Sequence, residues 1–114
     1  MKKEITNDLQ EQRNNAVEVR TEIKIVENFT HYILYSNGRV WNTRTERFLG
    51  ERTNKQGYIY VRLKDDQGFN HECYLHRLIY EAFKGEIPQG LQINHIDENK
   101  QNNNINNLEL VTAK

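Results

Sequence analysis

Hydrophobic and polar residues alternate through the middle of the chain with a period that is typical of strands. Between residues 22 and 41 the apolar positions come in short runs, which Ser36-Asn37-Gly38 interrupts. Asn-Gly between two such runs is a strong hairpin signal. A second pair of runs, residues 58–63 and 69–75, flanks the turn sequence Asp65-Asp66-Gln67-Gly68. The pattern therefore predicts a small antiparallel sheet.

The period changes after the second pair of runs. Apolar residues within positions 75–84 share one face of a short helix, and Gly85 with Pro88 just beyond it ends the pattern. We expect this helix to cover the sheet. A brief apolar strand over residues 91–93 and another over residues 108–111 follow. Between them, six of the nine residues from 99 to 107 are asparagine, which favours local side-chain hydrogen bonds over regular structure.

The first 28 residues are predicted to be a segment of their own, either a charged tail or a loosely docked helix. Residues 1–20 carry few apolar side chains, so a helix there would have only a thin hydrophobic stripe. A role of this segment in self-association stays open. Residues 29–114 are expected to form one domain, because 114 residues with 36% hydrophobic content leave room for a single modest core.

Composition excludes several classes of protein. No apolar run approaches the ~20 residues needed to span a bilayer, and the charged N-terminus does not look like a signal peptide. We therefore expect a cytoplasmic protein with no membrane partner. The single cysteine, Cys73, excludes an internal disulfide and argues against redox chemistry as a function class. The spacing of His71, Cys73 and His76 is compatible with zinc, but without a second thiol we do not favour a zinc site.

The charge of the chain is uneven. A formal net charge of zero argues against a nucleic-acid partner, because DNA phosphates are bound through an excess of Lys and Arg. Residues 39–64, however, carry seven Lys and Arg against two Glu, interleaved with aromatic residues. This stretch predicts a DNA-binding surface made of Arg39, Trp41, Arg44, Arg47, Arg52, Lys55, Arg62 and Lys64. The alternative is a solvated strand face on which arginine stems cover aromatic rings.

The pair Asn94-His95 suits the hydrolysis of a phosphodiester. That reaction needs a water deprotonated near neutral pH and a cation beside the departing 3′ oxygen, and a histidine next to an oxygen ligand supplies both. Neighbouring side chains on a strand point to opposite faces. The pair must therefore lie at a strand end or an irregular turn if both side chains are to reach one phosphate.

Three motifs resemble the phage-type HNH homing endonucleases. They are the His-Arg-Leu helix within residues 74–83, Ile93-Asn94-His95-Ile96-Asp97, and residues 106–112 with their Asn-Asn-Leu-Glu. Residues 35–40 are similar to a small sheet module that accompanies this core, so the resemblance covers about residues 30–112. It implies an α+β fold: a small antiparallel sheet, a covering helix, and a C-terminal ββα-metal hairpin whose final helix is truncated.

The resemblance also implies an activity and roles for residues. The chain would be a metal-dependent endonuclease that nicks or cleaves double-stranded DNA by hydrolysis, in a phage-infected host. His95 would be the general base, and Asn94 would offer its amide oxygen to Mg²⁺ or Mn²⁺. Asn107 would tie the loop across the hairpin and help to orient His95. His76 would pack or bond to backbone, and Asp97 would close an Asx turn rather than bind metal.

Two departures from the family pattern leave the activity open. The last metal ligand of the family, an Asn or His, would lie beyond Lys114, and Glu98 stands where the family favours glycine in a turn. The chain could be a fragment, or it could complete its site from another subunit or through Asp97. It could also be a nuclease relic that keeps a DNA-binding or protein-binding surface and has lost cutting. The alternative function is therefore a catalytically inactive phage protein that binds DNA or inhibits a host protein, such as a defence nuclease. Oligomeric state and target sequence are not predicted.

Overall fold

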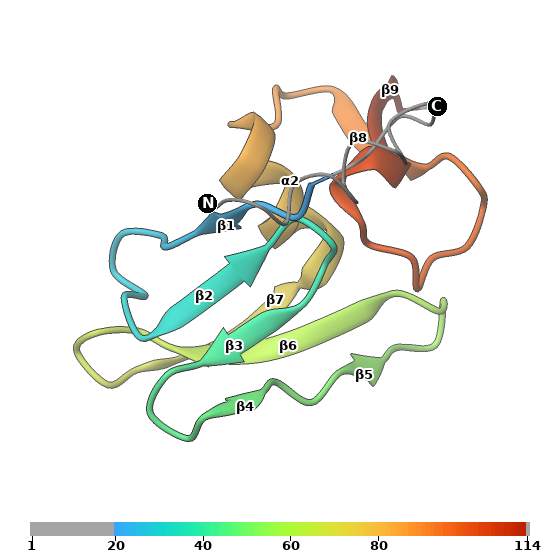
Figure 1. Cartoon of the computed structure of the whole chain (residues 1–114). Coiled ribbons are helices and arrows are strands. Elements are labelled where there is room, and N and C mark those ends of the chain that lie inside the picture. Colours follow the sequence, from blue (N-terminus) through green and yellow to red (C-terminus); the bar gives the residue numbers. More distant parts are fainter. Residues whose placement is uncertain (1–19, 114) are drawn as a thin grey trace, which may run out of the picture.

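Three small antiparallel sheets surround one α-helix in the computed structural model, which describes residues 20–113 (Figure 1). The predicted α+β class is confirmed within this part of the chain. The first sheet has the order β1 (Ile23–Lys24), β2 (Tyr32–Tyr35), β3 (Val40–Asn42), β4 (Arg47–Phe48). The second is β5 (Arg52–Thr53), β6 (Ile59–Lys64), β7 (Asn70–Tyr74), and the third pairs β8 (Leu91–His95) with β9 (Leu108–Thr112). The helix is α2 (Leu75–Lys84), and a short 3₁₀ turn, η2 (Ile105–Asn107), precedes β9.

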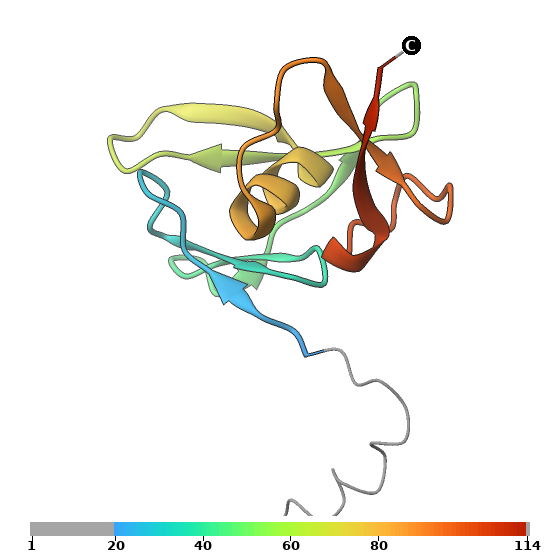
Figure 2. The same cartoon turned by 90° about the horizontal axis from the view of Figure 1, so that it is seen from above.

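The sequence predicted one central sheet, and here the structure corrects it, because the strands fall into two sheets. Helix α2 contacts β2 on one side and β6 and β7 on another, so each hairpin buries its own face against the helix (Figure 2). An amphipathic helix with a broad apolar face can bury two such surfaces at once. The separation therefore follows from the helix lying between the hairpins.

The turn at Gly38 closes the β2–β3 hairpin, as the Asn-Gly signal predicted. The Gly38 amide donates to the Tyr35 carbonyl at 2.9 Å, and Gly38 has a φ of +98°, a conformation that L side chains rarely adopt. Strand β1 adds to this sheet by pairing with β2. The domain boundary at residue 28 remains a prediction, and the expectations for residues 1–19 lie outside the described residues.

The second sheet alternates as its sequence predicted. In β6, Ile59, Val61 and Leu63 are buried, whereas Arg62 and Lys64 are exposed. The apolar side chains of β6 therefore face α2, and its charged side chains face away. This alternation gives the second sheet an outer surface that carries mainly polar and aromatic groups.

Helix α2 spans the residues that the apolar period predicted. Leu75, Ile79 and Tyr80 are buried, and Gly85 ends the helix with its amide donating to the Glu81 carbonyl. Leu34, Leu63 and Leu108 join them from the three sheets, so one core connects all three. Within residues 20–113 no helix has the length and apolar character needed to cross a membrane.

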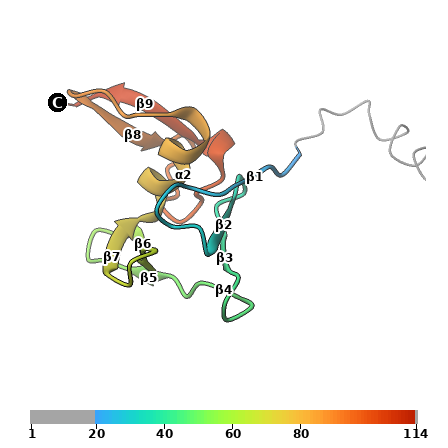
Figure 3. The same cartoon turned by 90° about the vertical axis from the view of Figure 1, so that its left-hand side faces the viewer.

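The β8–β9 hairpin lies across α2 from β4 and β5 (Figure 3). Strand β8 continues two residues further than the sequence predicted, because Asn94 and His95 pair with Glu109 and Leu108. His95 is thus the last residue of its strand. The asparagine-rich loop that follows contains Glu98 at a φ of +65°, so a non-glycine residue does make the turn that was expected there.

Candidate active site

Four rings from different parts of the chain meet where β8 ends. His95 is 5% exposed, and its ring centroid lies 5.3 Å from that of His76 and 6.1 Å from that of Tyr58. Tyr58 stacks on His76 at 5.0 Å, and Tyr74 lies 5.7 Å from His76. We call Tyr58, Tyr74, His76 and His95 the histidine cluster. It brings His95 next to the junction of β7 and α2.

Asn103 is the polar partner of His95. The Nε2 atom of His95 lies 2.8 Å from Oδ1 of Asn103, and both residues are buried. An amide oxygen only accepts hydrogen bonds, so in this arrangement Nε2 carries the proton and Nδ1 of a neutral His95 is the basic atom. Sequence reasoning missed Asn103, because it is one of six asparagines in a nine-residue stretch.

Asn94 points away from His95. It is exposed on the opposite face of β8, where its Nδ2 donates to Oε2 of the cross-strand residue Glu109 at 2.7 Å. The two side chains of the Asn94-His95 pair therefore lie on different faces of the hairpin, as strand alternation requires. Glu109 was not singled out from the sequence, although its place opposite Asn94 follows once the register is known.

The outer face of the hairpin offers oxygen donors of the type that Mg²⁺ and Mn²⁺ prefer. Oδ1 of Asn94 stays available while its Nδ2 is bonded, and the Glu109 carboxylate supplies a negative charge. These two residues fit a hard cation as part of its ligand set, with water and substrate oxygens completing it. No group of three or more His, Cys, Asp and Glu side chains suited to a metal ion occurs within residues 20–113.

Asn107 ties the asparagine-rich loop to the end of β8. Its Oδ1 accepts the Asp97 amide at 3.0 Å, and its Nδ2 donates to Oδ1 of Asp97 and to the Asn102 carbonyl, both at 2.9 Å. Hydrogen bonds from Asn102, Asn99 and Asn107 hold the pKa of Asp97 below its usual value. Asn107 touches the β8 end through Asp97 and Ile96 backbone, whereas the His95 ring bonds to Asn103.

His76 lies in the histidine cluster, whereas the sequence indicated only that it would pack or bond to backbone. Burial lowers its pKa to about 4, and the charges of His95 and Arg77 act in the same direction. Its Nδ1 atom is buried without a hydrogen-bond partner. His76 is therefore a neutral ring beside His95, a contact between residues that are far apart in the sequence.

Lys100 brings a positive charge to the edge of the histidine cluster. Its Nζ donates to the Gln56 carbonyl at 2.8 Å and lies 4.7 Å from the Tyr58 ring centroid. The contact links the asparagine-rich loop to the turn before β6. Tyr58 is thus held between a cation and an imidazole, a position that the sequence did not predict.

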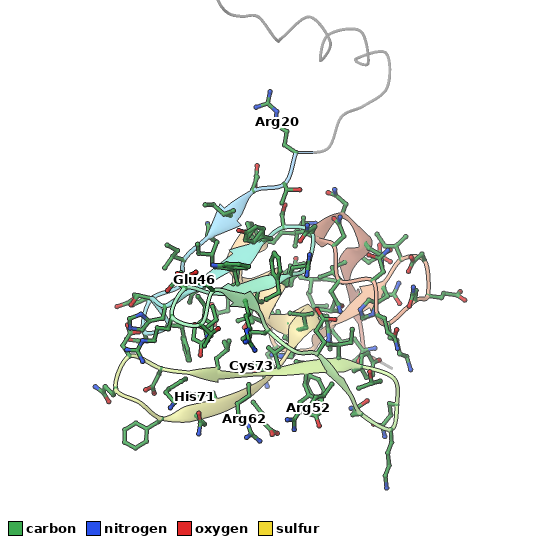
Figure 4. All side chains as sticks on the ribbon, turned by 60° about the horizontal axis from the view of Figure 1, so that its bottom comes forward. Arg20, Glu46, Arg52, Arg62, His71 and Cys73 are labelled. Atoms are coloured by element: carbon green, nitrogen blue, oxygen red, sulfur yellow. The ribbon has the colours of Figure 1, made fainter. Side chains whose placement is uncertain are left out.

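The eight residues expected to bind DNA are divided between two sheets. Arg39, Trp41, Arg44 and Arg47 belong to the first sheet and its turns, and Arg52, Lys55, Arg62 and Lys64 to the second. Arg39 covers the Phe48 ring at 3.5 Å, which matches the alternative expectation for that residue. Arg62 pairs with Glu72 at 2.9 Å. In Figure 4, Arg52 and Arg62 both project from the second sheet away from the core.

The residues with zinc-like spacing have separate surroundings. His71 bonds to Asp65 at 2.9 Å and packs against Phe29, whereas His76 lies in the histidine cluster. Burial raises the pKa of the Cys73 thiol, which disfavours the thiolate that a metal needs.

Known proteins are similar to this chain in sequence and in fold. The HNH endonuclease family model matches residues 73–114. The chain is 35% identical over 89 residues to an uncharacterized HNH endonuclease of Acanthamoeba polyphaga mimivirus, covering 78% of this chain and 27% of the relative. It is 30% identical over 93 residues to the H-N-H endonuclease F-TflII of Escherichia phage T5, covering 80% of this chain and 48% of that protein.

A solved structure of the HNH homing endonuclease I-HmuI, described as showing DNA binding and cleavage, superposes with a TM-score of 0.71. The superposition covers 80% of this chain and 52% of the other at 30% sequence identity. In sequence, the DNA endonuclease I-HmuI of Bacillus phage SP01 is 33% identical over 85 residues. The chain spans about half or less of the length of these relatives.

Proposed function

We propose, from the similarity of this chain to phage HNH homing endonucleases and from the match of residues 73–114 to the HNH endonuclease family model, that it cuts double-stranded DNA. The reaction would be metal-dependent hydrolysis of a phosphodiester. The observation that carries the proposal is the buried His95 at the strand end, with Nε2 bonded to Asn103 and Nδ1 left as its basic atom. The viral origin of these relatives supports action inside an infected cell.

His95 would act as the general base. It takes the proton of an attacking water at Nδ1 while the water oxygen bonds to phosphorus and the bond to the 3′ oxygen breaks. The 3′ oxygen then receives a proton from solvent. His76 lies beside His95 and is neutral, because burial lowers its pKa to about 4, so it places no positive charge next to the ring that would take the proton.

Asn94 and Glu109 would hold the divalent cation through oxygen atoms on the outer face of the hairpin, which requires the scissile phosphate to lie at the end of β8, where it meets both this face and the face that carries His95. A bound Mg²⁺ or Mn²⁺ would stabilise the negative charge that develops on the leaving oxygen. Asn107 would tie the asparagine-rich loop to the end of β8 through its hydrogen bonds to Asp97, which helps to orient His95.

The outer surface of the second sheet would bind the DNA backbone. Arg52, Arg62 and Lys64 face outward there, and such contacts position a protein on DNA without reading its sequence. The remaining basic residues of the predicted surface, Arg39, Arg44, Arg47 and Lys55, would extend the contact. Trp41 is half-buried and its ring lies 4.8 Å from that of Phe48, so we assign Trp41 to packing.

A supercoiled-plasmid assay with Mg²⁺ or Mn²⁺ tests the activity. His95→Ala should lower the nicking rate by about 10²–10⁴-fold, because a positioned general base contributes that much. His71→Ala is the matched control, since His71 lies outside the histidine cluster, and it should nick at the rate of the unaltered chain. Equal nicking by the His95→Ala variant would overturn the proposal.

The second candidate is an inactive protein that binds DNA or inhibits a host protein. It is supported by the neutral amide at position 94, which is a weak metal ligand and is already bonded to Glu109. If the unaltered chain nicks no plasmid with either metal, this candidate replaces the first. A steep loss of DNA affinity with salt would then favour DNA binding over protein inhibition.

A further inference from the structure

We propose that Asn103 is a positioning residue for His95, and that the Gly38 turn of the first sheet holds Asn103 in place. This inference rests on the proposed role of His95 as general base and specifies how the fold prepares it. The first sheet would then take part in the reaction indirectly, in addition to any contact with DNA.

The first step is the contact between the two buried side chains. Oδ1 of Asn103 lies 2.8 Å from Nε2 of His95, and the two residues are only 4% and 5% exposed. In buried surroundings a ring nitrogen that loses its partner is not compensated by water, so this contact fixes both the proton on Nε2 and the orientation of the ring. In the neutral ring, Nδ1 is then the nitrogen without a proton, which is the atom that must take one.

The second step is the contact between Asn103 and the Gly38 turn. A Cβ atom at position 38 would lie 2.8 Å from the backbone carbon and oxygen of Asn103, so only glycine leaves room for the loop. Next to it, the Ile105 amide donates to the Ser36 carbonyl at 2.8 Å. The loop that carries Asn103 therefore packs directly against the β2–β3 turn.

The ring proton of His95 gives a readout that does not depend on activity. In metal-free, ¹⁵N-labelled protein we expect a protected ring N–H signal on Nε2 of His95. Asn103→Asp keeps an acceptor and should retain the signal, whereas Asn103→Ala should lose it to solvent exchange. Asn106→Ala is the control, because Asn106 is exposed in the same loop and should leave the signal unchanged.

Two glycine variants test the role of the turn. Gly38 and Gly68 have φ values of +98° and +99°, but a Cβ atom at Gly68 would meet nothing within 4 Å. Gly38→Ala and Gly68→Ala therefore impose the same backbone strain, and only the first displaces Asn103. We expect the His95 ring signal to weaken or disappear in Gly38→Ala and to persist in Gly68→Ala.

Nicking rates complete the test. Asn103→Ala should nick about 10–100-fold more slowly than the unaltered chain, as is typical when the partner that orients a reacting side chain is removed, and Asn103→Asp should recover part of the loss. A protected Nε2 proton that persists in Asn103→Ala would overturn the inference, as would a spectrum with no proton on Nε2 in the unaltered chain. Absence of nicking together with the expected spectra would instead count against the proposed function alone.

Discussion

His76 stays neutral to a lower pH than an exposed histidine does. Its ring is partly buried between Tyr58 and His95, and burial together with the nearby His95 lowers its pKa to about 4. We expect the ring C–H signals of His76 to titrate with a midpoint of about 4 in the folded chain and near 6.5 in urea. A folded-state midpoint near 6.5 would show that the ring is better solvated than this contact implies.

The same shift makes stability depend on pH. The unfolded chain binds a proton at His76 more readily than the folded chain, so protonation favours unfolding. The contribution of His76 to stability is complete above pH 6.5 and is lost as the pH falls from 6.5 through about 4. His76→Gln should flatten the stability curve over that interval, as measured by urea unfolding at a series of pH values.

Single residues differ in how far the sequence could predict them. Asn94 and His95 are adjacent in a motif, so both could be proposed as site residues from the sequence alone. Asn103 could not be separated from its five asparagine neighbours, because only the loop conformation decides which amide turns inward. The contact of His76 with His95 depends on where α2 lies relative to β8, and local pattern carries no such information.

At the scale of elements, the asparagine-rich loop depends on Asn107. This side chain makes three hydrogen bonds and is 8% exposed, so Asn107→Ala removes them and leaves the part-buried Asp97 amide and Asn102 carbonyl without this partner. We expect a loss of about 2–3 kcal/mol in the free energy of unfolding, measured by chemical denaturation. Asn106→Ala, at an exposed neighbouring position, should change it by less than about 0.5 kcal/mol. Similar losses for the two variants would show that the loop does not depend on this particular amide.

Helix α2 and the Gly38 hairpin could be predicted because each has a complete local signal. The helix has an apolar period that ends at Gly85, and the hairpin has Asn-Gly between two apolar runs. The division into two sheets could not be predicted in the same way. Strands β1, β4 and β5 are two residues long, too short for a period, and their pairing follows from how α2 separates the hairpins.

At the scale of the whole molecule, the histidine cluster is the place where the three sheets converge. The second sheet supplies Tyr58 and Tyr74 at its ends, the third supplies His95, and the first supports Asn103 through the Gly38 turn. None of these sheets could hold the site alone, since each is small and shares its core with α2. The overall fold therefore serves to bring short elements to one point.

Charge is also arranged on the scale of the molecule, because a chain of zero net charge can bind DNA only through a local excess. Arg52 lies on the outer surface of the second sheet, on the same side as Arg62 (Figure 4). If Arg52 contacts a phosphate, Arg52→Ala should weaken binding to all duplex sequences alike and reduce the slope of log affinity against log salt by about 1. Fluorescence anisotropy with a labelled duplex measures both quantities.

Lys84→Ala provides the matched control, because it removes one positive charge from the last turn of α2 instead. A general effect of net charge would lower affinity in both variants by a similar factor, since each loses one unit of charge. A contact at the second sheet would change the salt slope in Arg52→Ala alone. Equal slopes in all three proteins would place the DNA elsewhere, and the first sheet with Arg44 and Arg47 would then be the surface to vary next.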